Sequence, residues 1–248
     1  MIVLKSPEEI EKMRRASRIV AEVINELEPL VKPGVTTKEL DRVAEDLMKK
    51  KKAVPAFKGY RGYPAVLCTS INEIVVHGIP SDRVLKQGDI IGIDCGVIVE
   101  GFYGDSARTF PVGPVEEESR RLMEVTRQSL DKGIEQMKVG NRIHDISWAV
   151  QNHVELQGFS VVRDFVGHGI GRALHEEPQV PNFGTPHTGM RLTVGMVLAI
   201  EPMVNIGRPD VKVLDDGWTA VTTDGKRSAH FEHTIALTDK GFEVLSVA

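Results

Sequence analysis

The sequence has little cysteine and no long apolar run, and each shortage excludes a class of protein. Only two of the 248 residues are cysteines, Cys68 and Cys95. Two are too few for a disulfide framework, so we expect small, buried, apolar side chains in a reducing compartment. No segment approaches the roughly 20 apolar residues of a membrane-spanning helix. The opening residues, MIVLKSPEEIEKMRR, become charged too early for a signal or transit peptide. We therefore expect a cytoplasmic protein without a membrane partner.

The chain also lacks an excess of positive charge. Its formal net charge is −4, which argues against sequence-specific binding of nucleic acid. With 41% hydrophobic and 27% charged residues, the composition is that of a globular protein able to bury a core without crosslinks. No heptad pattern forces an oligomer, so we expect a monomer. One basic run, Lys49 to Lys52, is ordinarily a solvated helix end; the alternative is a transient contact with the ribosome through its RNA.

Capping signals predict two helices near the N-terminus. Ser6 and Glu9 form a capping box, and apolar residues then recur at helical spacing as far as Leu27. A second capping box, Thr36 with Glu39, opens a helix that runs into the lysines. Short β-rich runs follow at 65–70, 90–96 and 103–110.

The chain then repeats its own plan. Three segments recur in the same order: 32–40 as 138–146, HGI at 77–79 as HGI at 168–170, and 85–94 as 192–201. The last pair aligns Asp94 with Glu201, and each half closes on a β-like run with one further acid, Asp105 or Glu232. We therefore predict a single catalytic domain, residues 1–248. Its two similar halves, about 5–112 and 113–240, would bring their acids together around a pseudo-twofold axis.

The positions of these acids favour a functional site. Asp94 and Glu201 each belong to a continuous apolar run, the pattern of a strand buried on both faces. A buried ionised carboxylate needs a partner. Taken singly, Asp94 could cap a turn and Glu201 could pair with an arginine. His168, flanked by two glycines in VGHGIG, can approach such a cluster closely; the alternative is a histidine in a flexible turn.

The combined set matches a metal centre. It contains two Asp, two Glu and one His: Asp94, Asp105, His168, Glu201 and Glu232. These side chains can hold two divalent cations if two carboxylates bridge, and such ligands suit Mn²⁺, Fe²⁺, Co²⁺ or Zn²⁺ in a hydrolytic site. No G-x-S-x-G elbow or Cys–His constellation competes for the role of nucleophile.

Five segments together resemble the type I methionine aminopeptidases: SINEIVVHGIP, IDCGVIVEGFYGDSARTF, GHGIGRALHEEPQV, IEPM and FEHTIALT. The resemblance spans about residues 3–245 and implies the pita-bread α+β fold, in which helices back a curved antiparallel sheet. The implied reaction removes the first methionine from newly made proteins whose second residue is small and uncharged. By the same resemblance Asp94 binds one cation, His168 and Glu201 bind the other, and Asp105 and Glu232 bridge them.

The resemblance also implies roles in catalysis and substrate binding. Glu201 accepts a proton from the water that lies between the cations and attacks the first peptide bond. His175 stabilises the tetrahedral intermediate, and His77 contacts the substrate backbone; the alternative for His77 is a satisfied loop histidine. A set of side chains surrounds the methionine of the substrate, unless it is ordinary core: Phe57, Tyr60, Tyr63, Cys68, Leu174 and Trp218.

One segment departs from the usual bacterial pattern and leaves the shape of the methionine pocket open. GRALHE places Ala173 and Leu174 where GRGFHE is more common. Two rival functions also stay open. An X-Pro aminopeptidase or prolidase of the same fold usually carries an additional N-terminal domain, and a non-catalytic binding module would tend to lose metal ligands.

The remaining histidines fall into two groups. His144 and His153 lie in a helix-like run and His187 lies in a Pro/Gly loop, where structural roles are expected. His230 and His233 flank the last acid and could orient the metal ligands, since residues beside ligands often do so.

Overall fold

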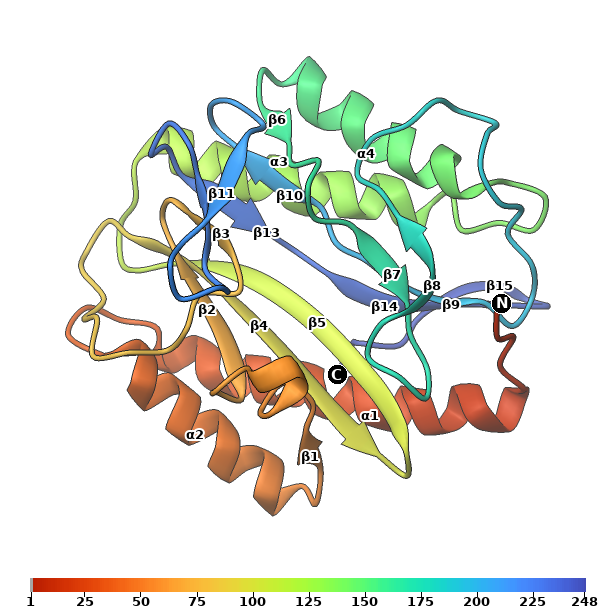
Figure 1. The fold of residues 1–248 in the computed structure, drawn as a ribbon, viewed down its shortest axis with the longest axis horizontal. Coiled ribbons are helices and arrows are strands. Elements are labelled where there is room, and N and C mark those ends of the chain that lie inside the picture. Colours follow the sequence, from red (N-terminus) through yellow and green to blue (C-terminus); the bar gives the residue numbers. More distant parts are fainter. Residues whose placement is uncertain (1) are drawn as a thin grey trace.

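The computed structural model describes residues 2–248 as helices and antiparallel sheets (Figure 1). The helices are α1 (Pro7–Leu27), η1 (Glu28–Leu30), α2 (Thr37–Lys50), η2 (Tyr60–Gly62), α3 (Glu117–Ile134) and α4 (Ile143–Leu156), where η denotes a short 3₁₀ turn. None of the helices described between residues 2 and 248 is both long and apolar enough to cross a membrane.

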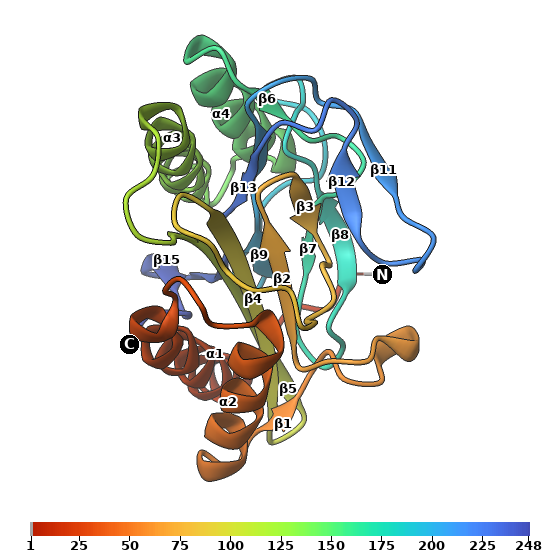
Figure 2. The same cartoon turned by 90° about the vertical axis from the view of Figure 1, so that its left-hand side faces the viewer.

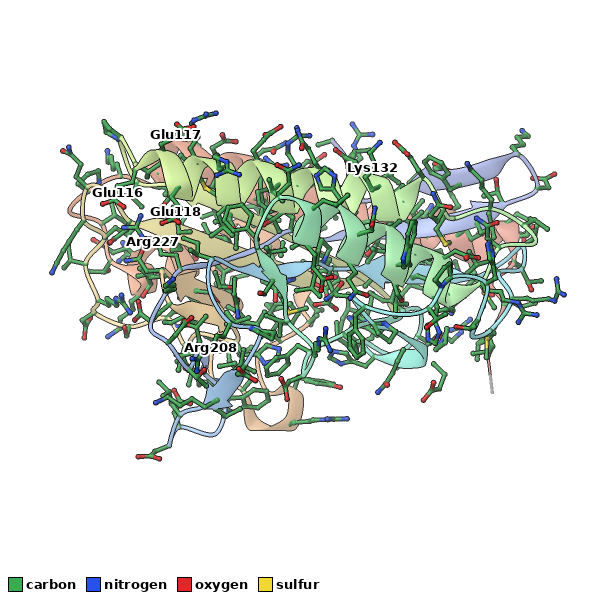
Figure 3. The ribbon with its side chains drawn as sticks, turned by 90° about the horizontal axis from the view of Figure 1, so that it is seen from above. Glu116, Glu117, Glu118, Lys132, Arg208 and Arg227 are labelled. Atoms are coloured by element: carbon green, nitrogen blue, oxygen red, sulfur yellow. The ribbon has the colours of Figure 1, made fainter. Side chains whose placement is uncertain are left out.

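The helix starts confirm the predicted capping signals. Ser6 Oγ accepts a hydrogen bond from Glu9 N at 3.3 Å, and Glu9 Oε2 accepts one from Ser6 N at 3.0 Å. Thr36 and Glu39 form the same reciprocal pair at α2. Each box satisfies two backbone donors that a helix start leaves unpaired. Seen from above, α3 begins with acids and carries Lys132 in its last turn, which complements the helix dipole (Figure 3).

The strands form four antiparallel sheets. In the first sheet β4 (Ile90–Val99) pairs with β1 (Val54–Pro55), β2 (Leu67–Ile71) and β5 (Phe102–Pro111). The second has the order β15 (Gly241–Val244), β14 (His233–Thr238), β9 (Val197–Ile200), β7 (Gly167–Gly169) and β8 (Glu176–Val180). The third joins β11 (Val211–Val213), β12 (Ala220–Thr222) and β3 (Ile74–Val76), and the fourth joins β13 (Ser228–His230), β10 (Met203–Asn205) and β6 (Ser160–Val161).

Similar elements follow one another in both halves. α1 and α2 precede the β4–β5 pair, and α3 and α4 precede the β9–β14 pair. In each half an isolated bridge joins the start of the second helix to the segment before β4 or β9, namely Thr36 to Val84 and Arg142 to Arg191. The four α-helices lie on one side of the strands, with β11 and β12 on the other (Figure 2). We propose that these halves form one domain.

Strand β5 and the start of β14 join the two halves. Thr234 Oγ1 accepts a hydrogen bond from Asp105 N at 3.2 Å and donates one to Asp105 O at 2.8 Å. Glu232 N donates to Ala107 O at 2.9 Å. One predicted acid from each half is therefore fixed at this junction through its own backbone.

Each half buries its own apolar core beneath its helices. One core packs α1 and α2 against β4 through residues such as Val20, Leu40 and Ile93. The other packs α3 and α4 against β9 and β14, with Leu122 and Ile146 among its members. These cores leave the opposite faces of the central strands free to carry polar side chains.

Candidate metal centre

The structure brings the five predicted metal ligands into one cavity of about 520 Å³. Asp94 lies in β4, Asp105 in β5 and His168 in β7. Asp94 pairs with Ala107, so Asp105 is its diagonal neighbour on the same face of the hairpin. The other two acids were expected within strands but lie one residue outside them. Glu201 follows β9, and Glu232 precedes β14.

The ligand atoms are close enough to share cations. One atom each from Asp105, His168 and Glu232 lie within 4.8 Å of one another. His168 Nε2 is 3.5 Å from Glu201 Oε1. Asp94 is the diagonal neighbour of Asp105 and lines the same cavity, which places the fourth acid beside the group.

The orientation of His168 suits a metal ligand. Its Nδ1 lies 2.9 Å from the Gly169 carbonyl oxygen, so in the Nδ1–H tautomer it donates there and Nε2 presents a lone pair to the acids. Burial lowers the pKa of His168 to about 3, which favours the neutral ring that metals bind. A Cβ added at Gly167 or Gly169 would collide with a carbonyl oxygen of β9 or β8. Both glycines are therefore needed for the close approach of the strands around His168.

Three buried carboxylate oxygens of the cluster lack a protein partner in the described part of the chain and are suited to bind a cation. Among residues 2–248, Asp94 Oδ1, Asp105 Oδ1 and Glu232 Oε1 have no hydrogen-bonding partner. Burial raises the pKa of Asp94 to about 7 and that of Glu201 to about 8. Burial, reinforced by repulsion from neighbouring acids, raises the pKa of Asp105 and Glu232 well above their ordinary values. Divalent cations would satisfy these oxygens and favour the ionised acids.

The two predicted catalytic histidines line the same cavity. The ring centroid of His175 is 4.3 Å from that of His168, and its Nδ1 is 2.8 Å from the Tyr60 hydroxyl. His77 has a φ of +61°, a strained conformation of the kind that concentrates at functional sites. Its ring packs edge-on against Phe165 and Trp218. Burial lowers the pKa of both histidines, that of His77 to about 4.

An apolar wall closes one side of the cavity. It contains every predicted pocket residue, namely Phe57, Tyr60, Tyr63, Cys68, Leu174 and Trp218. The Tyr63 and Trp218 rings pack edge-to-face with centroids 5.0 Å apart. The Tyr63 hydroxyl lies 3.0 Å from the carbonyl oxygens of both Leu67 and Gly78, which fixes the ring in place. Cys68 and Cys95 are both free and buried, as predicted.

Some residues at the cavity were not predicted. They are Arg61, Val166, Gly167, Glu176, Glu177 and Gln179. Gln179 is the β8 partner of His168. Gln179 belongs to the GHGIGRALHEEPQV segment, but the sequence alone does not show which residue of this segment lies opposite His168; the strand register does.

The other histidines divide largely as expected. His144 and His153 lie in α4, and His187 lies in a loop near the start of that helix. His233 turns away from the acids to Ser246, with Nδ1 and Oγ 2.7 Å apart. His230 instead places Nε2 3.4 Å from Glu201 Oε2, within the cluster.

Comparisons with known proteins agree with this site. The profile of metallopeptidase family M24 matches residues 11–239. A methionine aminopeptidase of Clostridium acetobutylicum is 55% identical over 248 residues, covering 100% of this chain and 99% of the relative. The crystal structure of methionine aminopeptidase from Thermotoga maritima has a TM-score of 0.98 at 49% identity and full coverage of both chains.

A more distant likeness shows the fold alone. The prolidase from Pyrococcus horikoshii has a TM-score of 0.80 at 24% identity, and the match covers 98% of this chain but 63% of that one. The predicted pita-bread fold is therefore confirmed. With the family profile and the near-complete coverage of its relatives, the chain belongs to metallopeptidase family M24, in which its similarity is to the methionine aminopeptidases.

Proposed function

We propose that this protein removes the N-terminal methionine from newly made proteins and peptides whose second residue is small and uncharged. The observation that carries the proposal is the single cavity in which five metal-ligand residues adjoin an apolar wall. Full-length similarity to methionine aminopeptidases supports the same reaction.

We further propose that the centre holds two divalent cations. The ligands would be Asp94, Asp105, His168, Glu201 and Glu232, with Asp105 and Glu232 between the two ions. Such ions lower the pKa of water enough to supply hydroxide near neutral pH. Mn²⁺, Fe²⁺, Co²⁺ and Zn²⁺ all suit this set of oxygen and imidazole ligands.

The side chains of the protein would perform the remaining steps. Glu201 is the proposed proton acceptor for the attacking water. His175, whose Nδ1 is next to the Tyr60 hydroxyl, is left with Nε2 to donate to the developing oxyanion. Removing such a donor costs about 2.7–4 kcal/mol of transition-state stabilisation. His77 would contact the substrate backbone, and a free amine beside Asp94 would restrict cleavage to the first bond.

The apolar wall would select methionine. The flexible thioether packs well against aromatic rings such as those of Tyr63 and Trp218. Leu174 is only 3% exposed and lies in the same cluster, so it forms part of this wall despite its departure from the usual aromatic residue.

We also propose a cytoplasmic monomer. Two free buried cysteines support a reducing compartment. The case for a ribosome contact is weakened because Lys51 Nζ lies 2.9 Å from both Glu22 and Glu26, and Lys49 pairs with Glu45. Replacement of Lys49 to Lys52 with glutamate should reduce ribosome co-sedimentation if the contact exists; unchanged co-sedimentation would contradict it.

A peptide panel tests the specificity. The protein should release the first residue from Met-Ala-Ser but not from Met-Lys-Ser or Leu-Ala-Ser when Mn²⁺ or Co²⁺ is added after chelation. Cleavage of an Ala-Pro peptide in preference to Met-Ala-Ser would support the X-Pro alternative. No cleavage of any peptide with any metal would favour the binding module.

A further inference from the structure

His230 lies at the end of β13, two residues before Glu232, and its backbone is held from several directions. Its N–H donates to Thr109 Oγ1 at 2.9 Å, and the Thr109 hydroxyl donates to the His230 carbonyl oxygen at 2.8 Å. In the β10–β13 pair it is opposite Met203. These contacts fix the point from which the imidazole extends.

The imidazole is buried in the metal centre. Its side chain is 4% exposed, and Nε2 lies 3.4 Å from Glu201 Oε2. Among residues 2–248, Nε2 has no other partner and no well-formed hydrogen bond. A buried polar nitrogen without a partner carries a substantial free-energy cost, so its orientation toward Glu201 requires an explanation.

Glu201 lies between two imidazoles. Its Oε1 is 3.5 Å from His168 Nε2, and its Oε2 is 3.4 Å from His230 Nε2. The Glu201 carbonyl oxygen accepts a hydrogen bond from Asn182 Nδ2 at 3.1 Å. A different side chain therefore lies next to the Glu201 carbonyl oxygen and next to each of its two carboxylate oxygens.

The two imidazoles differ in what they can offer. His168 donates through Nδ1 to Gly169 O, which leaves Nε2 as an acceptor beside Oε1. An ionised Glu201 and a neutral His168 present two acceptors to each other at 3.5 Å, so they can share a cation but not a hydrogen bond. Oε2 then needs a donor, and His230 Nε2 is in place to supply it.

We propose that His230 is a positioning residue for Glu201. In its Nε2–H tautomer it donates to Oε2 and thereby turns Oε1 toward the cation beside His168. The 3.4 Å separation is long for a hydrogen bond, but such contacts at active sites often tighten only in the loaded complex. The inference rests on the proposed metal centre and not on the choice of peptide substrate.

The test compares His230→Gln, His230→Asn and His230→Leu with the parent chain. Glutamine can place an amide donor near the position of Nε2, asparagine is too short to reach it, and leucine has no donor. The matched control is His233→Leu, because His233 is a half-buried histidine next to Glu232 that contacts Ser246 instead of Glu201. Mn²⁺ affinity is measured by titration calorimetry on chelator-stripped protein, and the visible spectrum of the Co²⁺ form reports the ligand set.

We expect His230→Leu and His230→Asn to bind Mn²⁺ about 10–100-fold more weakly than the parent, as is typical when a ligand loses its supporting hydrogen bond. His230→Gln and the control should remain within about threefold. The Co²⁺ spectrum of His230→Gln should match that of the parent. Affinity unchanged in both His230→Leu and His230→Asn would overturn the inference.

An alternative is that His230 Nε2 binds the cation itself. In that case His230→Gln would bind as weakly as His230→Asn and its Co²⁺ spectrum would change, which would also overturn the positioning role. Because no peptide is used, these results do not depend on methionine specificity. Failure of the parent chain to bind Mn²⁺ would instead overturn the metal centre and the inference together.

Discussion

Lys5 and Glu176 form a buried ion pair next to the loop that contains Leu174 and His175. Lys5 Nζ is 2.6 Å from Glu176 Oε2, and the two side chains are 3% and 13% exposed. The other oxygen, Glu176 Oε1, accepts hydrogen bonds from Arg172 N at 2.8 Å and Ala173 N at 3.2 Å. Oε1 therefore stabilises the turn of the loop, and Oε2 links the loop to the N-terminal segment.

Replacement of Lys5 with methionine keeps most of the buried stem but removes the charge. Breaking a buried pair at one partner costs about 3–5 kcal/mol because the remaining charge is left uncompensated. Glu176 keeps two backbone donors in this case, so we expect the lower end, a loss of about 3 kcal/mol in unfolding free energy. The double change Lys5→Met with Glu176→Gln removes both charges and should recover about 2 kcal/mol of that loss.

Urea unfolding followed by circular dichroism measures these losses, and methionine release from Met-Ala-Ser reports the loop. We expect kcat to fall in Lys5→Met, because the loop positions His175. Lys38→Met is the control, since the Lys38–Asp82 pair has side chains 67% and 87% exposed and should contribute less than about 1 kcal/mol. A Lys5→Met protein as stable as the Lys38→Met control would refute the reasoning, as would a double variant less stable than the single one.

Three further predictions follow from the fold and the site. Between pH 6.5 and 8, chelator-treated protein should lose stability as pH rises, because Asp94 and Glu201 keep protons in the fold up to a pKa of about 7 and about 8 but ionise near pH 4 when unfolded. The free energy of unfolding should fall by about 1.4 kcal/mol per pH unit for each retained proton, and excess Mn²⁺ should abolish this dependence. A melting temperature that rises with pH over this range would contradict the prediction. Gly104→Ala should destabilise the protein by more than about 2 kcal/mol, because its Cβ would collide with the α1 backbone at Ala16 and Ser17, whereas Gly92→Ala, with nothing closer than 3.5 Å, is the control; equal urea midpoints would contradict it. Tyr60→Phe removes the hydroxyl beside His175 Nδ1 and should lower kcat about fivefold, equivalent to about 1 kcal/mol; an unchanged kcat would show that the contact does not orient His175.

Local sequence signals predicted much of the fold. The capping boxes at Ser6 and Thr36 placed both helix starts, because those hydrogen bonds join residues only three apart. The β-rich runs at 65–70, 90–96 and 103–110 correspond to β2, β4 and β5. The internal repeat predicted the order of the elements. The acids in its apolar runs predicted the metal site, because buried carboxylates without cationic neighbours require another partner.

Contacts between distant residues could not be predicted in the same way. Lys5 carries no local sign of burial, and its partner Glu176 is 171 residues away. Gln179 and His230 reach the site through strand register, which depends on how separate segments pair. The position of His230 near Glu232 is evident from the sequence, but its contact with the Glu201 carboxylate is not. The role of Leu174 likewise depends on packing with residues such as Tyr63 and Trp218 from other segments.

The most direct test of the metal-dependent mechanism is the number of Mn²⁺ ions bound per chain, measured together with methionine release from Met-Ala-Ser, in the parent chain and in Asp105→Asn. We predict two ions and rapid release in the parent, loss of release after chelation with recovery on adding Mn²⁺, and fewer ions with no release in Asp105→Asn. Release that survives chelation, or that persists undiminished in Asp105→Asn, would contradict the assignment of this cluster as the catalytic metal centre.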